Sequence, residues 1–174
     1  VSSVSSTRSA AFTELKEEAK DRLRSMVRFG VTSVEGKTGY GLDRGTELKQ
    51  LKVMTKLDEE TLLNNTPTFL GAHAIPREYE NNREGFLDLV TEELAPLAAE
   101  RGAKFCDVFC DRGAFTVDES RRVLSRGKEL GMVPKIHADE IAGTGGAELA
   151  AEVGAISADH LLKASEDGLS MMKE

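Results

Sequence analysis

The chain has 174 residues, of which 30% are charged and 40% hydrophobic, a composition typical of one soluble domain with a substantial core. The formal net charge of -7 and the lack of a basic stripe with interleaved aromatic residues argue against nucleic acid as a partner. No apolar run approaches the roughly 20 residues that span a bilayer, and no signal peptide is visible. We therefore expect a cytoplasmic protein without a membrane partner.

Helix-like and strand-like segments alternate along the chain. The first helix-like segment has apolar residues on one face at Leu15, Ala19, Leu23 and Met26, whereas the strand-like segments are short apolar runs. Strands are expected at residues 31–35, 68–73, 105–110, 133–136 and 155–160. Helices are expected at residues 13–29, 43–57, 83–100, 116–131, 147–153 and from Ser165 onward, with a possible break at Pro96.

Local signals mark several helix ends. Thr13 and Ser165 are expected as N-caps, and the spacing of Thr116 and Glu119 is that of a capping box. Glycines follow the helix-like segments, as at Gly154. These signals favour helices that end sharply before each strand begins.

Strict alternation of strand and helix implies parallel strands joined by right-handed crossovers. An open doubly wound sheet and an eight-stranded barrel both satisfy this pattern. The first strand-to-helix turn lacks a GxGxxG motif, and polar groups stand at the ends of most strands, which favours the barrel. A complete barrel takes about 250 residues. The prediction is therefore an α/β fold, a partial (β/α)8 TIM barrel with about five of the eight βα units present.

The two cysteines, Cys106 and Cys110, lie in one apolar run and share a face if that run is a strand. A disulfide within one strand is geometrically poor, so we expect reduced core thiols. Asp111 follows directly, and the sequence assigns no role to Cys110 or Asp111.

All three histidines, His73, His137 and His160, fall at the ends of expected strands. The strand ends of one barrel converge on one pocket, so three imidazoles can line one site. Such a set suits a divalent metal ion, although any one of these histidines taken alone is as well explained by a structural hydrogen bond.

Carboxylates accompany two of the histidines. Glu140 lies three residues past His137 and can accept an N–H from a substrate or move a proton; the alternative is a solvated loop residue. Asp139 and Asp159 can orient the neighbouring imidazoles. If His160 points into the pocket, Asp159 should point away, so we expect a structural role for Asp159.

Two further residue types can take part in chemistry. Tyr40 lies in a glycine-rich loop and can close over a small ligand, or simply pack on a neighbouring loop. Lys37 and Lys135 raise the alternative of a Schiff-base enzyme, and Lys135 shares the strand parity of His137. A metal-free Schiff-base mechanism does not need three histidines, which favours the metal hypothesis.

Five segments of the sequence carry a resemblance to a known family: residues 34–42, 68–76, 107–110, 135–140 and 145–160. Together, and in this order, they resemble imidazolonepropionase, a member of the metal-dependent amidohydrolase superfamily. The resemblance implies a distorted (β/α)8 barrel of the amidohydrolase type, with a small β-sandwich built from both chain ends. It also implies a cytoplasmic, homo-oligomeric enzyme of histidine degradation that hydrolyses 4-imidazolone-5-propanoate to N-formimidoyl-L-glutamate on one zinc or iron ion.

The resemblance assigns roles to five residues. His137 matches a metal ligand. Tyr40, His73 and Glu140 match substrate contacts, and Glu140 is expected to take part in catalysis by hydrogen bonding to the substrate ring. His160 matches the histidine that activates the attacking water or steadies the oxyanion.

The family pattern is not complete in this chain. The HxH metal pair of the family's first strand, an arginine that grips the substrate carboxylate and an aspartate of the eighth strand have no match. Residues 1–174 are therefore expected to be the central part of the barrel, without the β-sandwich, and to be inactive alone. The amino-acid sequence of residues 141–144 also differs from the sequence usual for this segment in the family.

Two other functions stay open on the sequence. One is another cyclic amidohydrolase or deaminase of the same superfamily. Tyr40 and His73 distinguish imidazolonepropionase from these enzymes, because they match substrate contacts rather than metal ligands shared by the superfamily. The other is a non-catalytic βα-repeat module that binds a small ligand or a partner.

Overall fold

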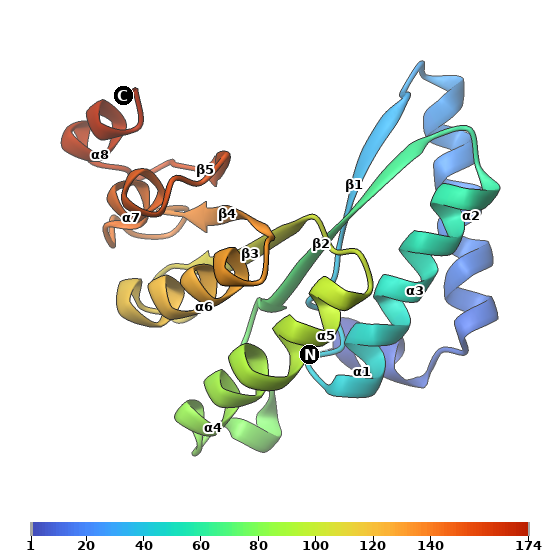
Figure 1. Cartoon of the computed structure of the whole chain (residues 1–174), viewed down its shortest axis with the longest axis horizontal. Coiled ribbons are helices and arrows are strands. Elements are labelled where there is room, and N and C mark those ends of the chain that lie inside the picture. Colours follow the sequence, from blue (N-terminus) through green and yellow to red (C-terminus); the bar gives the residue numbers. More distant parts are fainter. Residues whose placement is uncertain (1, 174) are drawn as a thin grey trace.

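The computed structural model describes residues 2–173, and five parallel strands form its single sheet (Figure 1). Each strand pairs with the next one along the chain, in the order β1-β2-β3-β4-β5. The sheet is curled, so the fold is the partial α/β barrel that the alternating pattern predicts. The strands are β1 (Ser33–Lys37), β2 (Asn64–Ala72), β3 (Phe105–Cys110), β4 (Val133–Ala138) and β5 (Ser157–His160).

Helices connect the strands and cover one face of the sheet (Figure 1). The helix α3 packs on β2, α6 on β3 and α7 on β4, while α2 packs on α3. The helical segments are α1 (Ser2–Ser9), α2 (Phe12–Arg28), α3 (Arg44–Glu60), the 3₁₀ turn η1 (Arg77–Tyr79), α4 (Arg83–Asp88), the π-helical η2 (Leu89–Leu94), α5 (Ala95–Glu100), α6 (Val117–Glu129), α7 (Gly146–Val153) and α8 (Glu166–Met171). Among these described residues, no helix combines the length and hydropathy needed to cross a membrane.

The main core lies between the sheet and the helices. It includes Phe69 of β2, Ile136 of β4 and Leu124 of α6, all without exposed surface. A second, smaller cluster joins α2, α3 and the residue before β2 through Leu23, Val53, Leu57 and Leu63. Two cores on one face leave the opposite face of the sheet to polar side chains.

Strand positions follow the predictions, with changes at their ends. Residues 105–110 form β3 as predicted, but β2 begins earlier, at Asn64, and β1 ends later, at Lys37. Both extensions lie in the region where β1 and β2 pair, from Ser33 with Asn64 to Lys37 with Thr68. Hydrogen-bond pairing with the neighbouring strand therefore extends the strands beyond the apolar runs that the sequence pattern detects.

Helix ends confirm some capping predictions and correct others. The Thr116–Glu119 capping box and the Ser165 cap are present. The prediction of Thr13 as an N-cap is wrong, because α2 begins one residue earlier, where the Ala11 N–H donates to the Glu14 carboxylate. The helix α1 was not predicted, since its serine-rich sequence has no apolar face.

The predicted break near Pro96 is a widened turn. Residues 83–100 run without interruption through α4, the π-helical η2 and α5. Pro96 has no N–H to donate to the preceding turn, and the widened π-helical turn lies directly before it. The segment is therefore continuous but irregular.

Candidate active site

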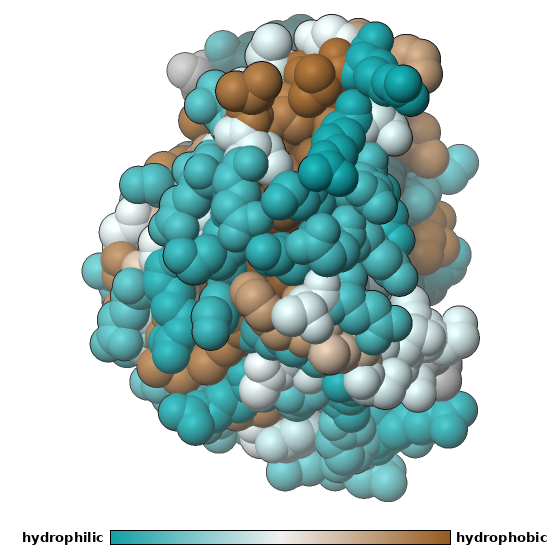
Figure 2. Space-filling view, turned by 90° about the vertical axis from the view of Figure 1, so that its right-hand side faces the viewer, coloured by the Kyte–Doolittle hydropathy of each residue, from teal (hydrophilic) through white to brown (hydrophobic). Residues whose placement is uncertain are grey.

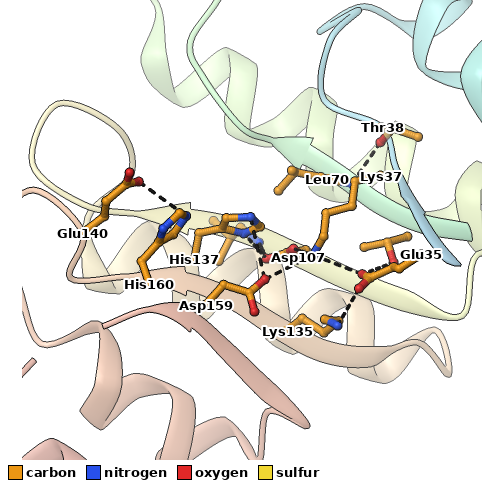
Figure 3. A network of polar contacts seen from close by, with 12 residues as sticks. Glu35, Lys37, Thr38, Leu70, Asp107, Lys135, His137, Glu140, Asp159 and His160 are labelled. Carbon is orange, nitrogen blue, oxygen red and sulfur yellow. Dashed lines mark hydrogen bonds and ion pairs between the residues drawn. The ribbon is translucent and has the colours of Figure 1, made fainter. Parts of the chain in front are cut away.

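A network of charged side chains covers the sheet face opposite the helices (Figure 3). Its members come from four of the strands: Glu35 and Lys37 from β1, Asp107 from β3, Lys135 and His137 from β4, and Asp159 from β5. Because alternate residues of a strand share a face, the positions of these residues follow from the pleat. Lys135 and His137 lie on the same face of the sheet, as their shared strand parity predicts.

The same alternation accounts for the cysteines. Cys106 and Cys110 flank Asp107 in β3 and point to the helix side, where both thiols are buried and free. Burial raises the pKa of the Cys106 thiol well above its usual range. The prediction of reduced core thiols is confirmed, and neither thiol joins the polar network.

Glu35 is the centre of the first half of the network. Its carboxylate accepts hydrogen bonds from Lys135 at 2.7 Å and Thr68 at 2.5 Å, and Lys37 lies 3.1 Å away. Burial alone would raise the pKa of Glu35, but these donors hold it below its ordinary value. Lys37 and Lys135 are therefore both held in ion pairs, which disfavours the Schiff-base alternative for these two residues.

The second half of the network joins Asp107, His137 and Asp159. Asp107 Oδ1 lies 3.0 Å from His137 Nδ1, and His137 Nε2 lies 3.9 Å from Asp159 Oδ2. One ligand atom from each of these residues lies within 4.8 Å of the others. Imidazole nitrogens and carboxylate oxygens are donor types that zinc and iron bind, so the chemistry of this group fits a metal ion.

The expectation that Asp159 points away from the pocket is wrong. Asp159 is the register partner of His137 in the neighbouring strand, so both side chains lie on the same face. His160 follows with a left-handed backbone (φ 75°), which breaks the alternation that the prediction assumed. Its ring still lies 5.4 Å from that of His137.

The five residues singled out by the sequence form two groups. His137, His160 and Glu140 make the first, in which His160 Nε2 is 3.5 Å from Glu140 Oε2 (Figure 3). Tyr40 and His73 make the second, with ring centroids 5.1 Å apart. Phe109 of β3 links the groups, since its ring lies 6.2 Å from His73 and 6.3 Å from His137.

Buried carboxylates hold the loops of both groups. Glu47 of α3 is fully buried and accepts the N–H groups of Gly39, Gly41 and Leu42, which surround Tyr40. Asp111 accepts the N–H groups of residues 140–142 and so holds the loop of Glu140. The sequence analysis assigned no role to Asp111 and did not single out Glu47, because a sequence does not show which backbone N–H groups a carboxylate will bind.

Asp139 has a different role from the one expected. Its buried carboxylate accepts N–H groups from Thr144, Gly146 and Ala147 rather than a histidine N–H. Its backbone is left-handed (φ 51°), a conformation that costs free energy in a non-glycine residue and turns the chain out of β4. Asp139 thus shapes the turn that presents Glu140.

The geometry defines a class of protein: a parallel βα barrel segment whose strand ends carry a metal-compatible histidine–carboxylate group beside aromatic and imidazole side chains. Comparison with curated proteins identifies the relatives. The chain is 55% identical to the imidazolonepropionase of Clostridium tetani over its whole length, which is 42% of that protein. It is 54% identical to the Geobacillus thermodenitrificans imidazolonepropionase over 97% of the chain and 40% of that protein.

No protein-family model matches the sequence. The chain is nevertheless a homologue of the imidazolonepropionases, and it spans about two-fifths of the length of these curated relatives. This finding confirms the resemblance drawn from the five sequence segments.

Proposed function

We propose that the protein containing this chain hydrolyses 4-imidazolone-5-propanoate to N-formimidoyl-L-glutamate. The observation that carries this proposal is the 55% identity to an imidazolonepropionase across the whole chain. The placement of Tyr40, His73, His137, Glu140 and His160 at neighbouring strand ends supports it. Residues 1–174 would then be the central part of an eight-stranded barrel of a cytoplasmic, homo-oligomeric enzyme.

His137 would be a metal ligand in this reaction, through Nε2. A zinc or iron ion held there supplies Lewis-acid polarisation of the ring carbonyl. The imidazole and carboxylate donors around His137 suit either ion.

His160 and Glu140 would act on the reacting ring. Glu140 accepts a ring N–H, which orients the cyclic amide, while His160 takes a proton from the attacking water or stabilises the developing oxyanion. Their 3.5 Å separation lets both side chains reach one small molecule. This pair therefore provides both the orienting and the proton-handling group.

Tyr40 and His73 would bind the opposite side of the ring. His73 Nδ1 lies 2.9 Å from the Gly39 carbonyl oxygen, which can only accept, so the Nδ1 carries the proton and Nε2 is free to contact substrate. Tyr40 is 42% exposed as a residue, and its ring lies against this imidazole. A different cyclic amidohydrolase activity would need other substrate-side residues here.

A segment exchange tests the proposed function. The matching 42% of the Clostridium tetani protein is replaced by this chain, so that the remaining segments come from the relative. We expect the zinc- or iron-loaded chimera to hydrolyse 4-imidazolone-5-propanoate. His160→Ala should lower kcat by about 10²-fold or more.

A matched control uses Glu59→Gln, a change in an exposed ion pair with Lys56 on α3, on the helix side of the sheet, which should leave turnover unchanged. A folded, metal-loaded chimera without turnover would refute the proposal. Turnover that His160→Ala leaves untouched would refute the assigned mechanism and favour another superfamily activity.

A further inference from the structure

We propose that Asp107 is a positioning residue that directs His137 Nε2 toward the metal ion. Neither the sequence pattern nor the family resemblance assigns any role to Asp107. The inference rests on the metal-binding role of His137 within the proposed function. Its basis is the contact between Asp107 and His137 in Figure 3.

The contact determines which imidazole nitrogen carries a proton. His137 Nδ1 lies 3.0 Å from Asp107 Oδ1, and an ionised carboxylate can only accept a hydrogen bond. The Nδ1 must therefore be the donor, which leaves the lone pair of Nε2 available in the neutral ring. A carboxylate that fixes the tautomer of a metal-binding histidine is a recurring arrangement in metalloproteins.

Asp107 itself has little freedom to move. Its side chain has no exposed surface, and Oδ1 also accepts the N–H of Val108 at 2.8 Å. Lys37 donates to Oδ2 at 2.6 Å, which compensates the buried negative charge. Burial alone would lower the pKa of Lys37, but Asp107 and Glu35 raise it, so the lysine stays charged.

The surroundings of Nε2 point to a cation. In the tautomer that Asp107 imposes, Nε2 is an acceptor, and it faces the Asp159 carboxylate at 3.9 Å. Asp159 Oδ2 also lies 3.5 Å from Lys37 Nζ, and a cation between Nε2 and the carboxylate would be bound by both acceptors. The strand β3 thus supplies the orienting group, β4 the ligand and β5 a carboxylate on the far side.

Nitrogen NMR of the chain tests the tautomer directly. The sequence has three histidines, so long-range ¹H–¹⁵N spectra at a pH where the rings are neutral contain three sets of ring signals. We expect a protonated Nδ1 in His137 of the wild type and a shift toward protonated Nε2 in Asp107→Ala. His73 is an internal control, because its Nδ1 donates to the Gly39 carbonyl and should be unaffected.

Metal affinity is the second readout, measured on the chimera by competition for zinc with a chromogenic chelator. Asp107→Ala should weaken zinc binding by about 10- to 100-fold. Asp107→Asn keeps an acceptor oxygen of the same size, so it should preserve more of the tautomer preference and of the affinity than alanine does. Circular dichroism verifies that each variant is folded.

Three results would overturn the inference: a protonated Nε2 in neutral wild-type His137, an unchanged tautomer in folded Asp107→Ala, or unchanged zinc affinity in that variant. None of these readouts uses the imidazolone substrate. If the chimera binds zinc through Asp107-oriented His137 but has no turnover, the proposed function fails and this inference stands.

Discussion

Asp111 shows how one buried carboxylate can hold a site loop. Its two oxygens accept the N–H groups of Glu140, Ile141 and Ala142, at 2.7, 2.8 and 3.1 Å. Burial alone would raise the pKa of Asp111, but these backbone donors hold it below its ordinary value. The ionised form is thus the one that stabilises the folded loop.

Asp111→Asn should therefore destabilise the chain by about 1–3 kcal/mol at neutral pH, since one oxygen becomes an amide donor facing backbone donors. Because the folded pKa is depressed, the advantage of the wild type is present above the ordinary aspartate pKa and is lost as the pH falls through the lower folded value. Urea unfolding at a series of pH values measures this difference. Asp118→Asn, at an exposed carboxylate of α6, should change stability by less than about 0.5 kcal/mol.

At the scale of elements, α6 packs closely on β3. A Cβ added at Gly127 would lie 2.5 Å from Cys106 Cβ, closer than side chains approach one another. At Gly45, in the first turn of α3, an added Cβ would meet only the Asp43 carboxylate at 3.5 Å, an ordinary contact. Two helical glycines thus differ in their surroundings rather than in their backbone conformation.

Gly127→Ala should lower the free energy of unfolding by about 1–3 kcal/mol through overpacking. Gly45→Ala should raise it by roughly 0.4–1 kcal/mol, because alanine reduces the conformational freedom of the unfolded chain. Thermal or urea unfolding of the two variants measures both effects. Equal effects in both variants would mean that α6 does not pack on β3 as described.

Elements were predictable where their signals are local. The apolar run of β3 and the capping box of α6 depend on residues a few positions apart, so sequence spacing was enough to place them. The positions of Asp107 and Asp159 beside His137 depend on strand register, which joins residues 30 and 22 positions from it. Backbone conformation was a further unknown, since the left-handed His160 changed which β5 side chains face the site.

At the scale of the whole molecule, both edges of the described sheet are free. Within residues 2–173, β1 pairs only with β2 and β5 only with β4. Figure 2 shows apolar atoms gathered at one end of the face that carries α2 and α3. Exposed apolar residues near the free edges and this end include Phe29, Leu62, Ile156 and Leu162, which are 64–97% exposed. Free strand edges beside apolar surface favour association.

We therefore expect the isolated chain to self-associate and to show no measurable hydrolysis of 4-imidazolone-5-propanoate with zinc or iron added. A catalytic zinc site usually has three protein ligands and an open position, and Lys37, 2.6 Å from Asp107 and 3.5 Å from Asp159, competes for the carboxylates around His137. Light scattering during gel filtration measures the association, and an assay over a range of metal concentrations measures the activity. Leu62→Lys should reduce association without restoring turnover, because solubility and a complete metal site are separate requirements. Turnover by the isolated chain at the rate of the chimera would show that these 174 residues hold a complete site.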